Sequence, residues 1–160
     1  MQPLRILEIG SCFDKWGGAE LHTLNLSEEL SKRGHDVSIV AQPGSFVEDE
    51  ARKRGVPMLP MTIRHKQAWS AAPQMRRLIE HTQADVVHVH GIRDYLVPPA
   101  VAHFSGVPAV VMTRHFPKKF RPHQRWLYGG ILLDHVIAVS ESVRQVLLTN
   151  LFDPDRVTTV

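Results

Sequence analysis

The sequence predicts an α/β fold, a doubly wound, Rossmann-like sandwich of three layers with about seven mostly parallel strands. Short apolar runs alternate with helical stretches about seven times along the chain. Most of these runs are apolar on both faces, which is typical of buried parallel strands. The chain has 160 residues, of which 43% are hydrophobic, and no linker or repeat interrupts it. We therefore expect a single domain over residues 1–160.

The expected strands are short runs rich in valine, isoleucine and leucine. The first has the sequence RILEIG and ends in a glycine. The third is weakened by its prolines, because proline has no N–H to donate to a neighbouring strand. The runs cover residues 5–10, 36–41, 56–63, 85–90, 109–113, 134–139 and 156–160.

The expected helices lie between these runs and carry their own start and stop signals. Gly34 follows the leucine-rich first helix and suits its C-terminal stop. Pro98 and Pro99 fit only the first turn of a helix or a kink. Gly129 and Gly130 predict a break in the fifth helix. The helical stretches cover residues 19–33, 47–54, 73–82, 96–104, 122–133 and 141–150.

Composition narrows the possible partners and the compartment. Nineteen Lys and Arg against sixteen Asp and Glu give a net charge of +3 with ten histidines neutral, which favours anionic partners. Nucleic acid is not expected, because this charge is small and no groove-reading motif is visible. The single cysteine, Cys12, cannot form a disulfide within the chain, so we expect a reducing, cytoplasmic compartment. We expect neither a membrane span nor a signal peptide.

In an open α/β sheet, ligands bind outside the carboxyl ends of the strands. Gly17 and Gly18 follow the first strand and directly precede a helix, where free N–H groups could bind an anion. A tight turn explains the same glycine pair equally well. Ser140 follows the sixth strand and is also a plausible helix N-cap. The polar candidates that follow the later strand ends are His90, Arg93, Asp94, Arg114, His115, Ser140 and Glu141.

Three histidines stand at or near strand ends. His88 and His90 alternate along a strand, so both point to the same face, and such a pair can hold a metal. Because no Asp, Cys or third histidine lies nearby with suitable spacing, we expect no metal and no other cofactor. We expect His88 to be buried and His90, at the strand end, to lie nearer a substrate. The position of His115 favours a functional role over a structural one.

Two segments combine basic and aromatic residues. Residues 114–125 (RHFPKKFRPHQR) hold five Lys or Arg, two phenylalanines and no acid, and residues 62–69 form a smaller stretch of this kind. Such segments suit anionic lipid headgroups or phosphorylated sugars. A solvated loop is the alternative interpretation.

Several enzyme classes are excluded by missing motifs. A dinucleotide fingerprint is absent after the first strand, and Ala41-Gln42 stands where a ribose-binding acid would end the second. A NAD dehydrogenase is therefore a poor fit. A P-loop NTPase and an α/β-hydrolase are also excluded, because neither Gly-Lys-Ser/Thr nor Gly-x-Ser-x-Gly occurs.

An ordered set of short motifs resembles the N-terminal domain of glycosyltransferase family 4, which has the two-domain GT-B fold. Each motif is weak alone, but together they cover nearly the whole chain. They are GGAE at 17–20, KRGHDV at 32–37, DVVHVHG at 85–91, TRH at 113–115, AVSES at 138–142 and PDRV at 154–157.

The resemblance implies transfer of a sugar, with retention of configuration, from a nucleotide-sugar donor to a glycan or lipid-linked acceptor, as in lipopolysaccharide, capsule or glycolipid synthesis. The donor is a substrate rather than a cofactor. By resemblance, Gly17 and Gly18 contact the donor phosphates, and His115 contacts the transferred sugar and stabilises charge. The resemblance also implies that this domain binds the acceptor. The candidate acceptor-binding residues are Glu20, His90, Arg93, Asp94, Arg114 and Ser140.

One departure from the family pattern is large. The C-terminal domain with its Glu-x7-Glu motif is missing, so we expect half of an enzyme, inactive alone and sharing the donor with the missing half. Family members that use lipid-linked acceptors bind the inner face of the membrane through basic and aromatic surfaces. By resemblance, this chain could bind there through the segments around Lys66 and Lys118. Alternatives are half of a GT-B-like nucleotide-sugar epimerase, or a non-catalytic ligand-binding module. A receiver domain fits poorly, because only Asp14 follows the first strand.

Overall fold

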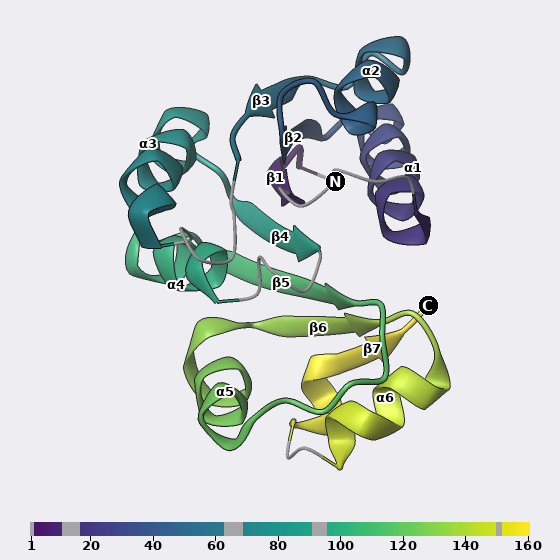
Figure 1. The fold of residues 1–160 in the computed structure, drawn as a ribbon, viewed down its shortest axis with the longest axis vertical. Coiled ribbons are helices and arrows are strands. Elements are labelled where there is room, and N and C mark those ends of the chain that lie inside the picture. The colour runs from purple at the N-terminus through teal and green to yellow at the C-terminus, as the bar shows by residue number, and fades with distance from the viewer. Residues whose placement is uncertain (1, 11–16, 63–68, 91–95, 150–151) are drawn as a thin grey trace.

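The computed structural model describes residues 2–10, 17–62, 69–90, 96–149 and 152–160 (Figure 1). Seven strands form one sheet in the order β3-β2-β1-β4-β5-β6-β7, and every neighbouring pair is parallel. This confirms the predicted doubly wound α/β architecture. The strands are β1 (Arg5–Ile9), β2 (Asp36–Ala41), β3 (Met58–Pro60), β4 (Val86–His90), β5 (Ala109–Arg114), β6 (His135–Ala138) and β7 (Val157–Thr159).

Helices cover both faces of the sheet. A smaller apolar cluster holds Leu24 of α1 with Val47 and Ala51 of α2, whereas a larger cluster holds residues of α3, α4, η4 and α6. Figure 1 shows α1 and α2 together beside β2 and β3, apart from α3 and α4. The helices are α1 (Gly18–Lys32), α2 (Phe46–Lys53), α3 (Ala72–Thr82), α4 (Val97–Phe104), α5 (Pro122–Trp126) and α6 (Glu141–Leu148), with short helical segments η2 (Trp69–Ala71), η4 (Leu127–Leu132) and η5 (Pro154–Arg156).

Several helix ends follow the signals seen in the sequence. Gly34 has φ +88, a left-handed conformation that suits glycine, and its N–H donates to the carbonyl of Ser31 at the end of α1. Pro98 and Pro99 lie at the start of α4, where a missing N–H has no cost. None of the helices in the described ranges is long and apolar enough to cross a bilayer.

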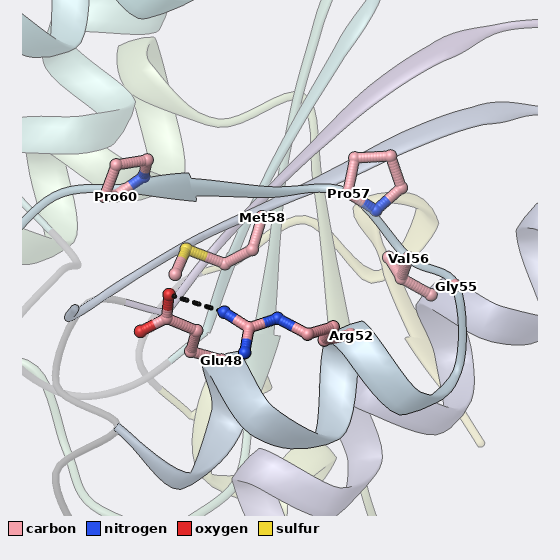
Figure 2. Close-up of a pocket in the computed structure, with 7 residues that line it drawn as sticks. All are labelled: Glu48, Arg52, Gly55, Val56, Pro57, Met58 and Pro60. Atoms are coloured by element: carbon pink, nitrogen blue, oxygen red, sulfur yellow. Dashed lines mark hydrogen bonds and ion pairs between the residues drawn. The ribbon is translucent and has the colours of Figure 1, made fainter. Parts of the chain in front are cut away.

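Two elements differ from the prediction. The third strand has only three residues, Met58–Pro60, because prolines at 57 and 60 limit its pairing. The expected break in the fifth helix is a change of helix type, with α5 continuing into the π-helical η4, which contains Gly129 and Gly130. A pocket between α2 and β3 (Figure 2) contains the ion pair between Glu48 and Arg52. It lies at the outer edge of the sheet, beyond β2.

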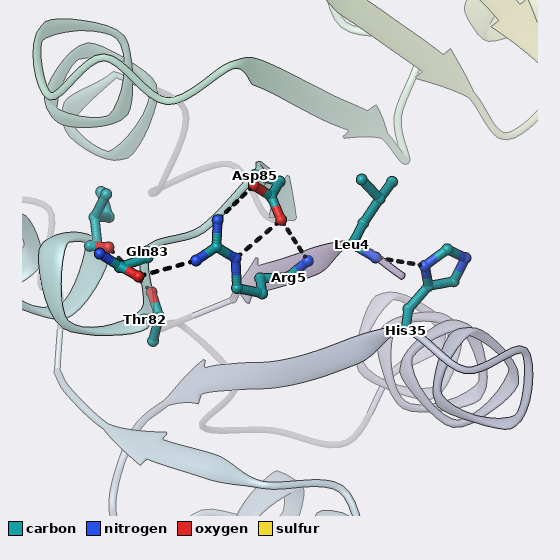
Figure 3. Close-up of polar contacts among 7 residues, drawn as sticks. Leu4, Arg5, His35, Thr82, Gln83 and Asp85 are labelled. Atoms are coloured by element: carbon teal, nitrogen blue, oxygen red, sulfur yellow. Dashed lines mark hydrogen bonds and ion pairs between the residues drawn. The ribbon is translucent and has the colours of Figure 1, made fainter. Parts of the chain in front are cut away.

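An ion pair joins β1 to the start of β4 at the amino ends of the central strands (Figure 3). The Arg5 guanidinium donates to Asp85 Oδ1 at 2.8 Å and to Oδ2 at 3.0 Å, and the Arg5 backbone N–H donates to Oδ2 at 2.9 Å. Gln83 accepts a further bond from Arg5. The hydrogen bonds from Arg5 lower the pKa of Asp85 to about 2. This contact helps to hold the two strands in register.

We expect the smaller apolar cluster to control stability through Leu24, which is fully buried on α1. Leu24→Ala should lower the free energy of unfolding by about 2–5 kcal/mol, because the cavity it leaves cannot fully collapse. The matched control is Leu21→Ala on the same helix, where the side chain is exposed and the loss should stay under about 1 kcal/mol. Urea unfolding of both variants provides the measurement, and equal losses would contradict this assignment of the core.

Candidate functional site

The order of the strands reverses between β1 and β4. β1 pairs with β2 on one side and with β4 on the other, and the chain leaves them toward opposite edges of the sheet. In open α/β sheets, a ligand crevice forms at such a point, outside the carboxyl ends of the strands. The parallel register places Glu8 of β1 directly beside His88 of β4. The candidate site is therefore built around these two strand ends.

A buried polar cluster occupies this point. Glu8 Oε2 lies 3.0 Å from His88 Nδ1 and 2.5 Å from His90 Nε2. His88 Nε2 lies 2.7 Å from Thr113 Oγ1 on β5. All four side chains are buried, and those of Glu8 and His90 are fully so. The cluster therefore connects three adjacent strands through side chains in the interior.

Two further histidines extend this cluster toward the surface. His22 comes from the first turns of α1, and His115 directly follows β5. Their ring centroids lie 5.3 Å apart in an edge-to-face arrangement, and each lies about 6 Å from the His90 ring (5.9 and 6.0 Å). Both rings are half-buried. His22 was not among the residues predicted from the sequence. Its position could have indicated it, because it lies two residues after Glu20 in the helix that begins at this edge of the sheet.

Burial sets the protonation of these groups. Desolvation lowers the pKa of His90 to about 3 and that of His115 to about 4, and it also lowers the pKa of His22. Burial alone would raise the pKa of the Glu8 carboxyl, but attraction to His88 and His90 outweighs this effect and holds the pKa well below its usual range. At neutral pH, His90 and His115 are therefore neutral rings that can both donate and accept hydrogen bonds.

The glycine pair lies where the sequence placed it, at the start of a helix. Gly17 is the N-cap of α1 and Gly18 is its first residue. A Cβ at Gly17 would lie 2.7 Å from Glu20 Oε2, so the Glu20 carboxylate rests against the helix start. A Cβ at Gly18 would meet no atom within 4 Å in the described structure. The backbone is therefore accessible at Gly18, beside a helix end that attracts anions.

Two of the other predicted site residues, Arg114 and Ser140, make contacts within the fold. The Arg114 guanidinium is buried, donates to the Lys118 carbonyl at 2.6 Å and lies 4.4 Å from the Phe120 ring centroid. Ser140 caps α6 by accepting from the Val143 N–H. Both contacts are internal to the fold. Arg93 and Asp94 lie outside the described residues.

The structure adds two facts about the histidine pair. His88 is buried, as predicted, and His90, which was expected to lie nearer a substrate, is buried even more completely, with the His22 ring of α1 5.9 Å from its own. The prediction of no metal considered only an Asp, a Cys or a third histidine as a further ligand. Glu8, 82 residues before His90 along the chain, is a potential third ligand, because the ligand atoms of Glu8, His88 and His90 all lie within 4.8 Å of one another.

Comparisons with known proteins agree with this architecture. The family model for Glycosyltransferase Family 4 matches residues 16–160. A glycosyltransferase from Rickettsia africae has a TM-score of 0.84 at 22% identity, with 100% of this chain and 43% of that chain covered. Anabaena Alr3699/HepE in complex with UDP-glucose has a TM-score of 0.77 at 14% identity, covering 98% and 43%. No curated protein matches the sequence.

A further structural neighbour has a different activity. UDP-GlcNAc 2-epimerase from Neisseria meningitidis, bound to UDP-GlcNAc, has a TM-score of 0.71 at 15% identity, covering 96% of this chain and 45% of that chain. At such identities the likeness concerns the fold, and it confirms the predicted N-terminal half of a GT-B fold. The chain spans less than half the length of these neighbours.

We expect the low pKa of His115 to make the fold less stable in acid. Because its pKa is about 4 when folded and about 6.5 when unfolded, the unfolded chain binds more protons between these values. The contribution of His115 to stability is therefore present above pH 6.5 and is lost as the pH falls toward 4.

Urea unfolding between pH 7 and pH 5 tests this expectation. His115→Gln should reduce the slope of unfolding free energy against pH by at most about 1.4 kcal/mol per pH unit, the value for one proton. Solvent screening of this half-buried ring keeps the change below that limit. Identical slopes for the variant and the wild-type protein would contradict the shifted pKa.

Proposed function

Because this chain belongs to glycosyltransferase family 4, we propose that it is the acceptor-side domain of a retaining glycosyltransferase. The enzyme transfers a sugar from a nucleotide-sugar donor to a glycan or lipid-linked acceptor. The observation that carries this proposal is the accessible start of α1 at Gly17 and Gly18, joined to His115 through the packing of His22. An anion-binding helix start and a neutral histidine thus border one crevice.

The donor phosphates occupy the start of α1 in this proposal. Backbone N–H groups at a helix N-terminus and the positive end of the helix dipole stabilise a diphosphate, and no side chain at Gly18 obstructs its approach. UDP and UDP-glucose are present in the structures of Anabaena Alr3699/HepE, a neighbour of this fold, which supports a nucleotide diphosphate as the ligand class. The second domain of the enzyme supplies the remaining contacts to the nucleotide.

His115 orients the sugar and responds to charge in the transition state. Its ring is neutral at pH 7, so it can donate a hydrogen bond to a sugar hydroxyl without needing to lose a proton. The leaving phosphate accepts the proton of the attacking hydroxyl as the bond to the anomeric carbon breaks. This front-face route retains the anomeric configuration, and His115 contributes positioning and electrostatic stabilisation.

The acceptor lies on the same edge of the sheet. Glu20, half-buried in the first turn of α1, is the described candidate closest along the chain to the donor site. Its carboxylate can accept hydrogen bonds from acceptor hydroxyls. Arg93 and Asp94 remain candidates from the segment after β4. Arg114, Ser140 and the buried His90 shape the crevice from beneath through the internal contacts described above.

Epimerisation of a nucleotide sugar is the second candidate function. It is favoured by the structural likeness to the UDP-GlcNAc 2-epimerase of Neisseria meningitidis. The family match favours glycosyl transfer. The two functions differ in their products, because an epimerase converts UDP-GlcNAc to its 2-epimer without an acceptor, whereas a transferase releases the nucleotide only as the sugar moves.

We predict that added methyl groups at the start of α1 impair donor use in the protein that carries both domains. Gly17→Ala and Gly18→Ala should each raise the KM for the nucleotide sugar roughly ten- to hundredfold, because the new Cβ holds the diphosphate away from the backbone N–H groups. Gly18→Ala should also leave stability unchanged or raise it by up to about 1 kcal/mol, since alanine favours helix.

Initial rates of sugar transfer at varied donor concentration provide the measurement for both variants. Gly130→Ala is the matched control, because its Cβ would likewise meet no atom within 4 Å in the described structure, and it lies in η4. It should leave the KM unchanged. If Gly18→Ala shows wild-type donor kinetics, the donor phosphates do not bind at the start of this helix.

A membrane surface is proposed as a further partner of this domain. The loop between β5 and α5 exposes Lys118, Lys119 and Phe116, and Trp126 at the end of α5 is also exposed. Cations beside exposed aromatic rings suit anionic headgroups at a bilayer interface. The smaller basic segment around Lys66 lies outside the described residues. This position agrees with a lipid-linked acceptor on the cytoplasmic face.

We expect the full-length protein to co-sediment with vesicles of anionic phospholipid more strongly than with zwitterionic ones. Replacing Lys118 and Lys119 by Ala should weaken this binding about thirtyfold, since each cation near the surface contributes about 1 kcal/mol. The control of equal charge is the replacement of Lys32 and Lys53, which pair with acids on α1 and α2. The proposed membrane surface is contradicted if the protein shows no preference for anionic lipid, or if both double variants lose the same amount of vesicle binding.

A further inference from the structure

We propose that Glu8, His88 and His90 form a binding site for a divalent transition-metal ion of the zinc type. The three residues come from two strands that pair in parallel, with Glu8 beside His88 in the register. The site lies at the same strand ends as the proposed transfer site, but the proposal does not rest on glycosyl transfer, and its test does not depend on that activity.

The ligand atoms already converge on one point. Glu8 Oε2 contacts both imidazoles, at 3.0 Å from His88 Nδ1 and 2.5 Å from His90 Nε2. In a tetrahedral zinc site with bonds of about 2.0–2.1 Å, neighbouring ligand atoms lie roughly 3.3 Å apart. The separation from His88 Nδ1 is close to this value, and that from His90 Nε2 must open by less than about 1 Å. The two imidazole nitrogens lie within 4.8 Å of each other, so side-chain adjustments on this scale would bring all three atoms around one ion.

The chemistry of the ligands selects the kind of ion. Two imidazole nitrogens and one carboxylate suit zinc and neighbouring transition metals, whereas calcium and magnesium prefer sites made of oxygen atoms. Two histidines and a glutamate form a set of three protein ligands that leaves a fourth position for another group. Within the described structure, Glu8 Oε1 has no hydrogen-bond partner, so a second carboxylate oxygen is available to the ion.

A second layer of contacts supports the same assignment. His88 Nε2 lies 2.7 Å from Thr113 Oγ1, and Thr113 is itself fully buried on β5. Metal-binding histidines usually use their other nitrogen in such a hydrogen bond, which fixes the ring and its tautomer. With Nε2 bonded to Thr113, Nδ1 of His88 is directed toward Glu8 and the proposed ion.

The burial of charge gives an independent reason for a cation. The Glu8 side chain is fully buried, and its ion pairs with described residues are those with His88 and His90. A fully buried carboxylate is costly unless positive charge or hydrogen bonds compensate it. A divalent cation compensates this charge while satisfying all three side chains. Protons shared among the same groups are the competing explanation, and metal titration distinguishes the two.

The experiment titrates the purified chain, after treatment with a chelator, with Zn²⁺ by calorimetry and with Co²⁺ by visible absorption. We expect one ion per chain, a tetrahedral Co²⁺ spectrum and a higher melting temperature with Zn²⁺. Glu8→Gln keeps the shape of the side chain and should weaken binding by more than about a hundredfold. Thr113→Val should weaken it about tenfold, as expected for a residue that orients a ligand.

Surface histidines are the main source of a false positive, because the chain has ten histidines. His103→Gln, at an exposed position on α4, is the matched control and should leave the tight site unchanged. Absence of a saturable one-to-one site, or unaltered binding in Glu8→Gln, would overturn the proposal.

If Glu8→Gln does not fold, as judged by circular dichroism, NMR of the wild-type imidazoles decides the question. Zn²⁺ at one equivalent must then shift the signals of His88 and His90 and leave His103 in place. Shifts confined to exposed histidines would overturn the proposal.

Discussion

The parallel pairing of β1 with β4 is the constraint on which the rest of the structure depends. It lies where the strand order reverses, so it separates the α1 and α2 side of the domain from the side built on α3 to α6. At one end of the pair, Arg5 and Asp85 hold the strands together. At the other end, the same register places Glu8 beside His88. The expected ligand position at the strand ends and the buried cluster are thus two results of one pairing.

The buried cluster also makes that register specific. A carboxylate inside a protein must be paired or hydrogen-bonded, because leaving water is costly for a charge. Among the residues that the structure describes, Glu8 meets this need through His88 and His90, and His88 in turn contacts Thr113. Side chains alternate between the faces of a strand, so a slip of one residue would turn Glu8 away from both histidines. Such a slip would leave an unpaired charge in the interior, which disfavours alternative pairings.

Much of the fold could be predicted from the sequence because its signals are local. Apolar runs, the Gly34 stop and the Ser140 cap each act within a few residues, and the structure confirms them. The site depended on contacts that local patterns do not contain. The link between Glu8 and His90 spans 82 residues, and a lone acid in an apolar run has no spacing that reveals its partners. Arg114 had the expected position, but tertiary packing directs its guanidinium to Phe120 and the Lys118 carbonyl.

The contacts of Arg114 link the proposed transfer site at His115 to the proposed membrane-binding loop with Lys118 and Lys119. Its guanidinium is buried at the end of β5, while the loop it holds exposes Lys118 and Lys119. Phe120 closes the same loop by packing into the larger apolar cluster. Because His115 is the first residue of this loop, the proposed membrane contact and the proposed transfer site share one anchored segment. If a bilayer binds the exposed lysines as proposed, it would lie on the segment that begins at His115, where a lipid-linked acceptor could reach the proposed transfer site.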